Sequence, residues 1–185
     1  MARRLHGMGV GANALTFTGF GVGILAALLI AGQSFILALC AILLSRLIDG
    51  LDGAVARLTT PTDRGGFLDI SLDFLFYASI PLAFAVANPA RNALAATALL
   101  AAFIGTGSSF LAFATIAAKR GMASTAYPDK SFFFLGGLAE AGETLAFFMG
   151  MCLWPQQFAL LAWIFCGLCA LTIVTRIYWG WRAFT

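Results

Sequence analysis

The acidic side chains best placed to do chemistry lie in one stretch of the sequence, between residues 46 and 73. Asp49, Asp52, Asp69 and Asp73 are four of the five aspartates within 25 residues of a chain in which only 10% of residues are charged. At about 100° per residue, the first two share one face of a helix, and the last two share a face of the next. Two neighbouring helices would therefore bring four carboxylates into one small volume.

Four carboxylates in a water-poor site need cations, because burial and mutual repulsion both disfavour their ionised form. Hard divalent cations with oxygen ligands meet this need, and Mg²⁺ and Mn²⁺ are the usual ions beside phosphates. Arg46 lies on the same face as Asp49, where it is either part of the site or an arginine that reaches to the membrane surface.

The spacing of these residues resembles the signature of the CDP-alcohol phosphotransferases, also called CDP-alcohol phosphatidyltransferases, which are membrane enzymes that make phospholipid head groups. The matching positions are Asp49-x2-Asp52-Gly53-x2-Ala56-Arg57-x7-Gly65-x3-Asp69-x3-Asp73. Every fixed position of the pattern is present, and the chain is most similar to small bacterial inner-membrane members. The resemblance implies that an acceptor hydroxyl attacks the β-phosphorus of a CDP-alcohol, most often CDP-diacylglycerol, and that CMP leaves.

The resemblance also implies roles for individual residues. Asp49, Asp52 and Asp69 are expected to bind two Mg²⁺ or Mn²⁺ ions. Asp73 resembles the residue that takes the proton of the acceptor, and we count it among the metal ligands as well. The nucleotide is expected to lie against Asp52, Gly53, Ala56, Arg57, Gly65 and Gly66, since small residues allow close approach and arginine can pair with a phosphate. A homodimer is expected by the same resemblance.

The composition is typical of a membrane protein, with 61% hydrophobic residues, 18 Phe and a mean hydropathy of +0.94. We predict an all-α integral membrane protein with a single domain over residues 1–185, a short cytoplasmic arm over 1–13 and six transmembrane helices. The predicted spans are 14–31, 34–57, 65–87, 92–117, 131–152 and 157–179. Scattered basic residues and a net charge of only +3 argue against nucleic-acid binding.

The distribution of basic residues predicts the orientation of the chain. If the N-terminus is cytoplasmic, six spans return the C-terminus to the same side, and 10 of the 11 basic residues lie on or toward it. Only Arg91 lies on the other side. The acidic stretch then faces the cytoplasm at a bacterial inner membrane.

The acceptor alcohol is left open by the motif, and glycerol 3-phosphate, inositol phosphate, serine and a simpler polyol all fit. Family members with phosphorylated acceptors hold the phosphate with basic residues, although such residues also set topology. The basic candidates are Arg64, Lys119, Arg120, Lys130 and Arg176. Glu140 and Glu143 are expected two to three turns inside the fifth span, near the depth of Asp69 and Asp73. They either line the acceptor pocket or form a hydrogen-bonded pair between helices.

A small divalent-cation transporter or channel is the alternative function, since intramembrane acids on facing helices occur in such proteins too. Transporters often show repeated halves with broken helices in matching places. This sequence shows no such repeat, and its acids crowd toward one predicted membrane side. A purely structural role is disfavoured, because an aspartate at the centre of a transmembrane helix costs about 2.5–3.5 kcal/mol.

Overall fold

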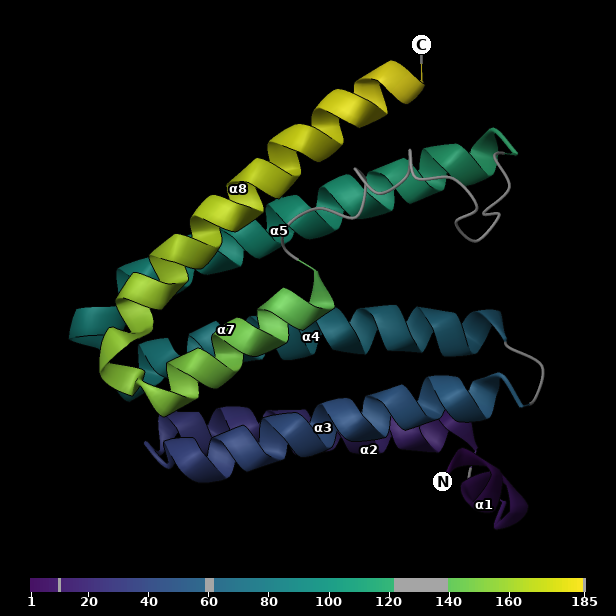
Figure 1. Ribbon diagram of the computed structural model, residues 1–185, viewed down its shortest axis with the longest axis horizontal. Helices are drawn as coiled ribbons and strands as arrows, with labels where there is room; N and C mark the ends of the chain where they lie inside the picture. Colours follow the sequence, from purple (N-terminus) through teal and green to yellow (C-terminus); the bar gives the residue numbers. More distant parts are fainter. Residues whose placement is uncertain (10, 59–61, 122–139, 185) are drawn as a thin grey trace.

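The protein is described by a computed structural model that covers residues 1–9, 11–58, 62–121 and 140–184 (Figure 1). Within these ranges all regular elements are helices, which confirms the predicted all-α class for this part of the chain. In order they are α1 (Ala2–Gly7), α2 (Ala12–Ala31), α3 (Phe35–Ala56), α4 (Asp63–Ala87), α5 (Pro89–Lys119), α7 (Ala141–Leu153), the short 3-10 turn η2 (Pro155–Gln157) and α8 (Phe158–Ala183).

Four helical segments are long and apolar enough to cross a membrane: α2, α4, α5 and the stretch Pro155–Ala183. Helix α3 has 22 residues but carries three charged side chains in its second half. Helix α7 has 13 described residues, fewer than the roughly 20 that a span needs. The fifth predicted span begins at residue 131, outside the described residues, so the count of six spans stays a prediction.

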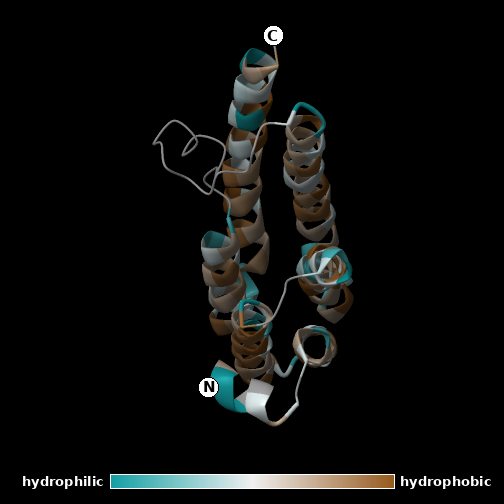
Figure 2. Ribbon diagram, turned by 90° about the vertical axis from the view of Figure 1, so that its right-hand side faces the viewer, coloured by the Kyte–Doolittle hydropathy of each residue, from teal (hydrophilic) through white to brown (hydrophobic). Residues whose placement is uncertain are grey.

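Helices α2, α3 and α4 run nearly along one direction, and α5 and α8 run obliquely to them (Figure 1). Helix α2 packs against α3 and α4, α4 packs against α5, and α5 packs against α8. The two termini, the turn between α3 and α4 and the end of α5 lie toward the right of Figure 1. The turns between α2 and α3, α4 and α5, and α7 and α8 lie at the left. In Figure 2 the helices are mostly hydrophobic, with hydrophilic residues at α1 and at helix ends. Helix α2 begins at Ala12, inside the predicted arm, and α1 occupies much of the rest.

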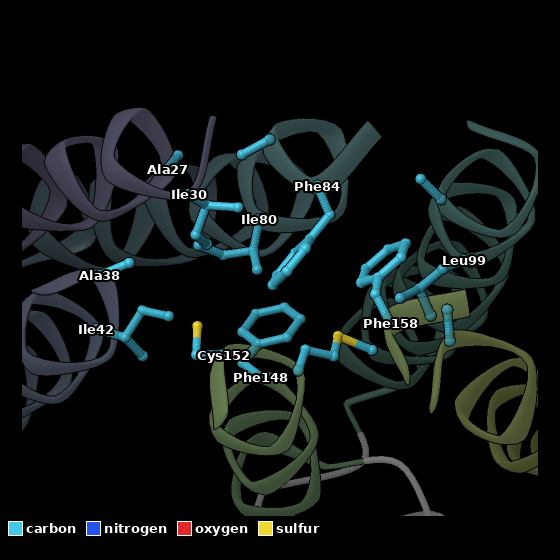
Figure 3. Close-up of a cluster of buried hydrophobic side chains, with 14 of the residues drawn as sticks. Ala27, Ile30, Ala38, Ile42, Ile80, Phe84, Leu99, Phe148, Cys152 and Phe158 are labelled. Atoms are coloured by element: carbon cyan, nitrogen blue, oxygen red, sulfur yellow. The ribbon is translucent and has the colours of Figure 1, made fainter. Parts of the chain in front are cut away.

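Aromatic side chains fill the core where the helices meet (Figure 3). Phe84 of α4 stacks on Phe158 of α8 with ring centroids 4.4 Å apart. Phe76 of α4 meets Phe148 of α7 edge to face at 6.2 Å. Such pairs add to the stabilisation from burial, and they fix α4 against both later helices.

The corner between α4 and α5 is held by polar side chains. Asn88 ends α4 and caps α5, where its side chain accepts a hydrogen bond from the backbone N–H of Arg91 at 3.3 Å. The buried side chain of Asn92 donates to the backbone oxygen of Phe84 at 2.9 Å. Gln33, in the turn after α2, donates to the backbone oxygen of Ala87 at 3.3 Å. This end of the structure is therefore cross-linked by hydrogen bonds.

Small residues bring α2 close to both of its neighbours. Ser45 of α3 donates from its hydroxyl to the backbone oxygen of Gly19 at 2.7 Å. A Cβ atom added to Gly23 would lie 2.5 Å from Cδ2 of Phe76 and 3.1 Å from Oγ of Ser45. Phe76 is completely buried and has no room to move away. Glycine at position 23 is therefore required by packing.

We predict that Gly23→Ala lowers the stability of the folded protein by about 1–3 kcal/mol, because the new methyl group overpacks the contact with Phe76. Gly21→Ala on the same helix is the matched control, since a Cβ there meets no atom within 4 Å. Apparent melting temperatures of the two variants in detergent provide the measurement. Equal melting temperatures for both variants would show that the contact yields without cost.

Candidate active site

Three of the four predicted aspartates form a cluster between α3 and α4. Asp49 comes from α3, and Asp69 and Asp73 come from α4, one turn apart. One carboxylate oxygen from each lies within 4.8 Å of the others. Oxygen-only donor sets suit hard cations such as Mg²⁺ and Mn²⁺, so this arrangement could hold a divalent metal ion.

Arg46 supplies a positive charge within the cluster. Its Nη1 donates to Oδ1 of Asp73 at 2.6 Å and to Oδ2 of Asp49 at 3.3 Å. The guanidinium also lies over the ring of Phe76, 4.0 Å from the centroid. These contacts link α3 to α4 and offset part of the repulsion among the acids.

Asp52 lies one turn beyond Asp49 on α3 and is the most buried of the four aspartates, with 6% of its surface exposed. Its buried Oδ2 has no hydrogen-bond partner among the residues that the structure describes. A buried carboxylate oxygen without a partner is costly, so it needs a ligand to complete it. A cation beside Asp52 would supply that partner, and the donor set therefore fits a metal ion.

A cavity of about 390 Å³ opens beside the cluster, at the start of α2 and α4 and the end of α3. Its lining contains Asp52, Asp69 and most of the residues predicted to bind the nucleotide; the full set is Gly11, Ala12, Asn13, Thr16, Asp52, Gly53, Ala56, Thr62, Gly65, Gly66 and Asp69. The volume is within the range of small-molecule sites. Arg57 is exposed, and its Nη1 lies 3.5 Å from the position that a Cβ on Gly53 would take.

The lining residues from the beginning of α2 were not identified from the sequence. Gly11, Ala12, Asn13 and Thr16 carry no motif, and only the contact of α2 with both acidic helices brings them to the cavity. Asn13 was the one available signal, as a polar residue at the edge of an apolar run. Its Oδ1 lies 3.4 Å from the position of a Cβ on Gly65, so a larger residue at 65 would narrow the cavity.

The basic candidates for acceptor binding are dispersed. Arg64 is exposed in the first turn of α4, directly before the cavity residue Gly65. Lys119 is exposed at the end of α5. Arg120 donates from Nη2 to the backbone oxygen of Phe184 at 2.6 Å, which ties the end of α5 to the end of α8. Lys130 lies outside the described residues.

Arg176 lies on α8 beside a second cavity. This cavity has a volume of about 400 Å³ between α5 and α8, is mostly apolar, and shares no lining residue with the cavity at Asp52. The side chain is buried, and its Nη1 donates to the backbone oxygen of Thr106 at 2.7 Å and to Oγ of Ser109 at 3.4 Å. These bonds join α8 to α5.

The prediction that Glu140 and Glu143 lie two to three turns inside a helix is wrong. Both are exposed at the beginning of α7, where Glu140 is the N-cap and Glu143 the third helical residue. They form a capping box, in which Oε2 of Glu143 accepts from the backbone N–H of Glu140 at 3.3 Å. The first N–H groups of a helix lack partners within it, and these two carboxylates supply them. A role in acceptor binding stays a proposal.

Comparison with known proteins covers almost the whole chain. The family model for CDP-alcohol phosphatidyltransferases matches residues 10–178. Inner membrane protein YnjF of Escherichia coli (strain K12) is 53% identical over 179 residues, which is 97% of this chain and 87% of that protein. Archaetidylinositol phosphate synthase of Pyrococcus horikoshii is 28% identical over 185 residues, covering 96% of this chain and 87% of that protein.

Solved structures show the same fold. Two crystal structures of phosphatidylinositol phosphate synthase from Mycobacterium tuberculosis align with a TM-score of 0.70 over 97% of this chain. The first has CDP-DAG bound, is 23% identical and is covered to 91% of its length. The second is a complex with manganese and citrate, is 24% identical and is covered to 87%. At these identities the likeness shows the fold.

We predict that Asp52→Asn weakens Mn²⁺ binding by about tenfold or more, because a full negative charge is removed within a few ångströms of the bound cation. Asp63→Asn is the matched control, since Asp63 is exposed in the first turn of α4 and outside the cluster. Titration of Mn²⁺ in detergent, followed by electron paramagnetic resonance without substrate, measures both. Unchanged affinity for Asp52→Asn would remove this residue from the ligand set.

Proposed function

The chain belongs to the CDP-alcohol phosphatidyltransferase family, and on that premise we propose that it moves a phosphatidyl group from a CDP-alcohol to an acceptor hydroxyl and releases CMP. It is an integral membrane protein, because four of its helical segments are long and apolar enough to cross a membrane and a relative is an inner membrane protein. One observation carries the proposal. Three carboxylates have oxygens within 4.8 Å of one another, and one of them, Asp69, also lines the cavity.

The donor is proposed to be CDP-diacylglycerol. The CDP-DAG complex of the Mycobacterium tuberculosis synthase supports this choice. The nucleotide would occupy the cavity against Gly53, Ala56, Gly65 and Gly66, whose missing or small side chains leave the space open. Arg57, at the rim beside Gly53, would pair with a phosphate.

Asp49, Asp52, Asp69 and Asp73 are the residues proposed to hold two divalent ions, Mg²⁺ or Mn²⁺. The manganese complex of the Mycobacterium tuberculosis synthase and the oxygen-only cluster support this assignment. When bound, such ions neutralise the diphosphate and stabilise the leaving CMP. The protein contributes by holding its carboxylates at fixed positions on α3 and α4, which both pack against α2, before the substrate arrives.

Asp73 is proposed to take the proton of the acceptor hydroxyl. Asp73 is half-buried and lies on α4, one turn beyond Asp69 in the cluster. One helix would therefore carry both a metal ligand and the base. A base placed at the reacting hydroxyl contributes about 10²–10⁴-fold to the rate in enzymes of many kinds.

The acceptor is proposed to be a phosphorylated polar alcohol. Inositol phosphate is the first to test, since the two relatives are named archaetidylinositol phosphate synthase and phosphatidylinositol phosphate synthase. Arg64 is the best placed basic candidate, because it precedes a cavity residue on α4. Lys119, Arg120, Lys130, Arg176, Glu140 and Glu143 remain further candidates. We also propose a homodimer in the inner membrane, with the acidic end toward the cytoplasm.

We predict that the purified protein releases CMP from CDP-diacylglycerol in the presence of Mn²⁺ and one acceptor from a panel of polar alcohols, and that a chelator stops the release. Mass spectrometry of the lipid products would identify the acceptor. The absence of CMP with every alcohol, together with Mn²⁺ flux into liposomes that contain the protein, would contradict the transferase and favour a cation transporter.

We predict that Asp73→Asn lowers kcat by about 10²-fold or more, because the proton acceptor is lost while the other three carboxylates remain. Binding of CDP-diacylglycerol should largely persist, which separates a lost base from a lost binding site. Turnover is followed through CMP release and binding through equilibrium titration. A near-normal rate in this variant would show that another group accepts the proton.

A further inference from the structure

Arg46 is the side chain that joins the two acidic helices at the level of the reaction site. It lies on α3, one turn before Asp49, and reaches across to α4. Only 13% of its side chain is exposed. An arginine that reached to the membrane surface would expose its guanidinium. Arg46 instead points inward, so the surface interpretation that the sequence left open does not hold.

The guanidinium of Arg46 is fixed on several sides. It donates to Asp73 at 2.6 Å, to Asp49 at 3.3 Å and, through Nη2, to Oγ of Ser45 at 3.3 Å. The ring of Phe76 lies below it at 4.0 Å. Ser45 in turn donates to the backbone of α2, so three helices meet around one side chain. A planar, delocalised cation suits this combination of stacking and hydrogen bonding better than an ammonium group.

The bonds from Arg46 use one oxygen of each carboxylate that they reach. Arg46 bonds Oδ1 of Asp73 and Oδ2 of Asp49, and these bonds do not involve the second oxygen of either carboxylate. A carboxylate is planar, so holding one oxygen also sets the direction of the other. With the positive charge of Arg46, the formal charge of the four aspartates changes from −4 to −3 for the group as a whole.

We propose that Arg46 is a positioning residue for phosphatidyl transfer: it orients Asp73 so that its second oxygen meets the acceptor hydroxyl, and its bond to Asp49 offsets part of the negative charge there. The inference rests on the proposed function, and it adds a residue outside the motif that carried that function. Arg46 does not touch the substrate in this role. It acts through the two aspartates, and its removal leaves all four carboxylates in place.

Two effects follow that a helix-pairing arginine would not produce together. Loss of orientation should lower kcat, since a misplacement of about 1 Å at a reacting group can cost about 10²-fold. Loss of the positive charge should strengthen cation binding, because Arg46 repels any cation at the carboxylates it bonds. A residue needed only for packing would instead lower turnover, cation binding and stability in parallel.

The test compares Arg46→Gln, Arg46→Lys and Arg46→Ala with the wild-type protein. Arg91→Gln is the control, since Arg91 is exposed near the opposite end of the structure. Three quantities are measured in detergent: kcat and KM for CDP-diacylglycerol from CMP release, Mn²⁺ affinity from titration without substrate, and apparent melting temperature. Guanidinium at low millimolar concentration is added to Arg46→Ala to refill the space over Phe76.

Arg46→Gln should lower kcat by about 100-fold, with KM within about threefold of wild type and Mn²⁺ bound severalfold more tightly. Arg46→Lys should recover part of the rate, and guanidinium should raise kcat of Arg46→Ala but not of Arg91→Gln. If Arg46→Gln does not fold, the other two variants carry the same comparison.

The inference is overturned if kcat stays near the wild-type value, or if Mn²⁺ binding weakens along with turnover. Should the wild-type protein release no CMP from CDP-diacylglycerol, the proposed function fails, and the Mn²⁺ comparison then judges Arg46 alone. Tighter Mn²⁺ binding by Arg46→Gln would then support a place for Arg46 beside the cation site. Equal or weaker Mn²⁺ binding would contradict it.

Discussion

The structure depends on compensating four negative charges on two facing helices of a largely apolar protein. Carboxylates so close together cannot all remain ionised unless positive charge is near. Arg46 provides one such charge from within the chain, and the unpartnered oxygen of Asp52 shows that compensation is incomplete without a ligand. This requirement supports the proposed cation site over a purely structural contact between the helices.

The packing around the cluster follows from this requirement. The acids must face one another at short range, so α3 and α4 need a common support that fixes their spacing. Helix α2 supplies it with glycines, which let Ser45 and Phe76 approach its backbone. The same helix begins beside the ends of its neighbours and completes the wall of the cavity. One element therefore both sets the spacing of the ligands and encloses the space next to them.

The sequence predicted the elements that hydropathy and helical period determine. The boundaries of α3 and α4 fall within two residues of the predicted ones, and the face shared by Asp69 and Asp73 is the face that meets Asp49. Helical period does not reveal which helices are neighbours, so the contribution of α2 to the cavity was missed. The apolar run before Leu153 looked like one continuous span, and the Glu140-x-x-Glu143 pattern that begins α7 was interpreted as a buried polar face. Glutamate is not among the preferred N-cap residues, so the sequence did not indicate this capping box.

The corner at Asn88 has a mechanical consequence for the distant acids. Hydrogen bonds from Asn92 and Gln33 hold that end of α4. A change in the tilt of the helix would therefore take this corner as its pivot. Asp69 lies about 28 Å along the axis from the pivot, and a tilt of about 2° would carry its carboxylate about 1 Å past α3. Coordination distances tolerate only about 0.2 Å. A slight loosening at the Asn88 corner would thus be amplified into a displacement larger than the proposed metal site could tolerate.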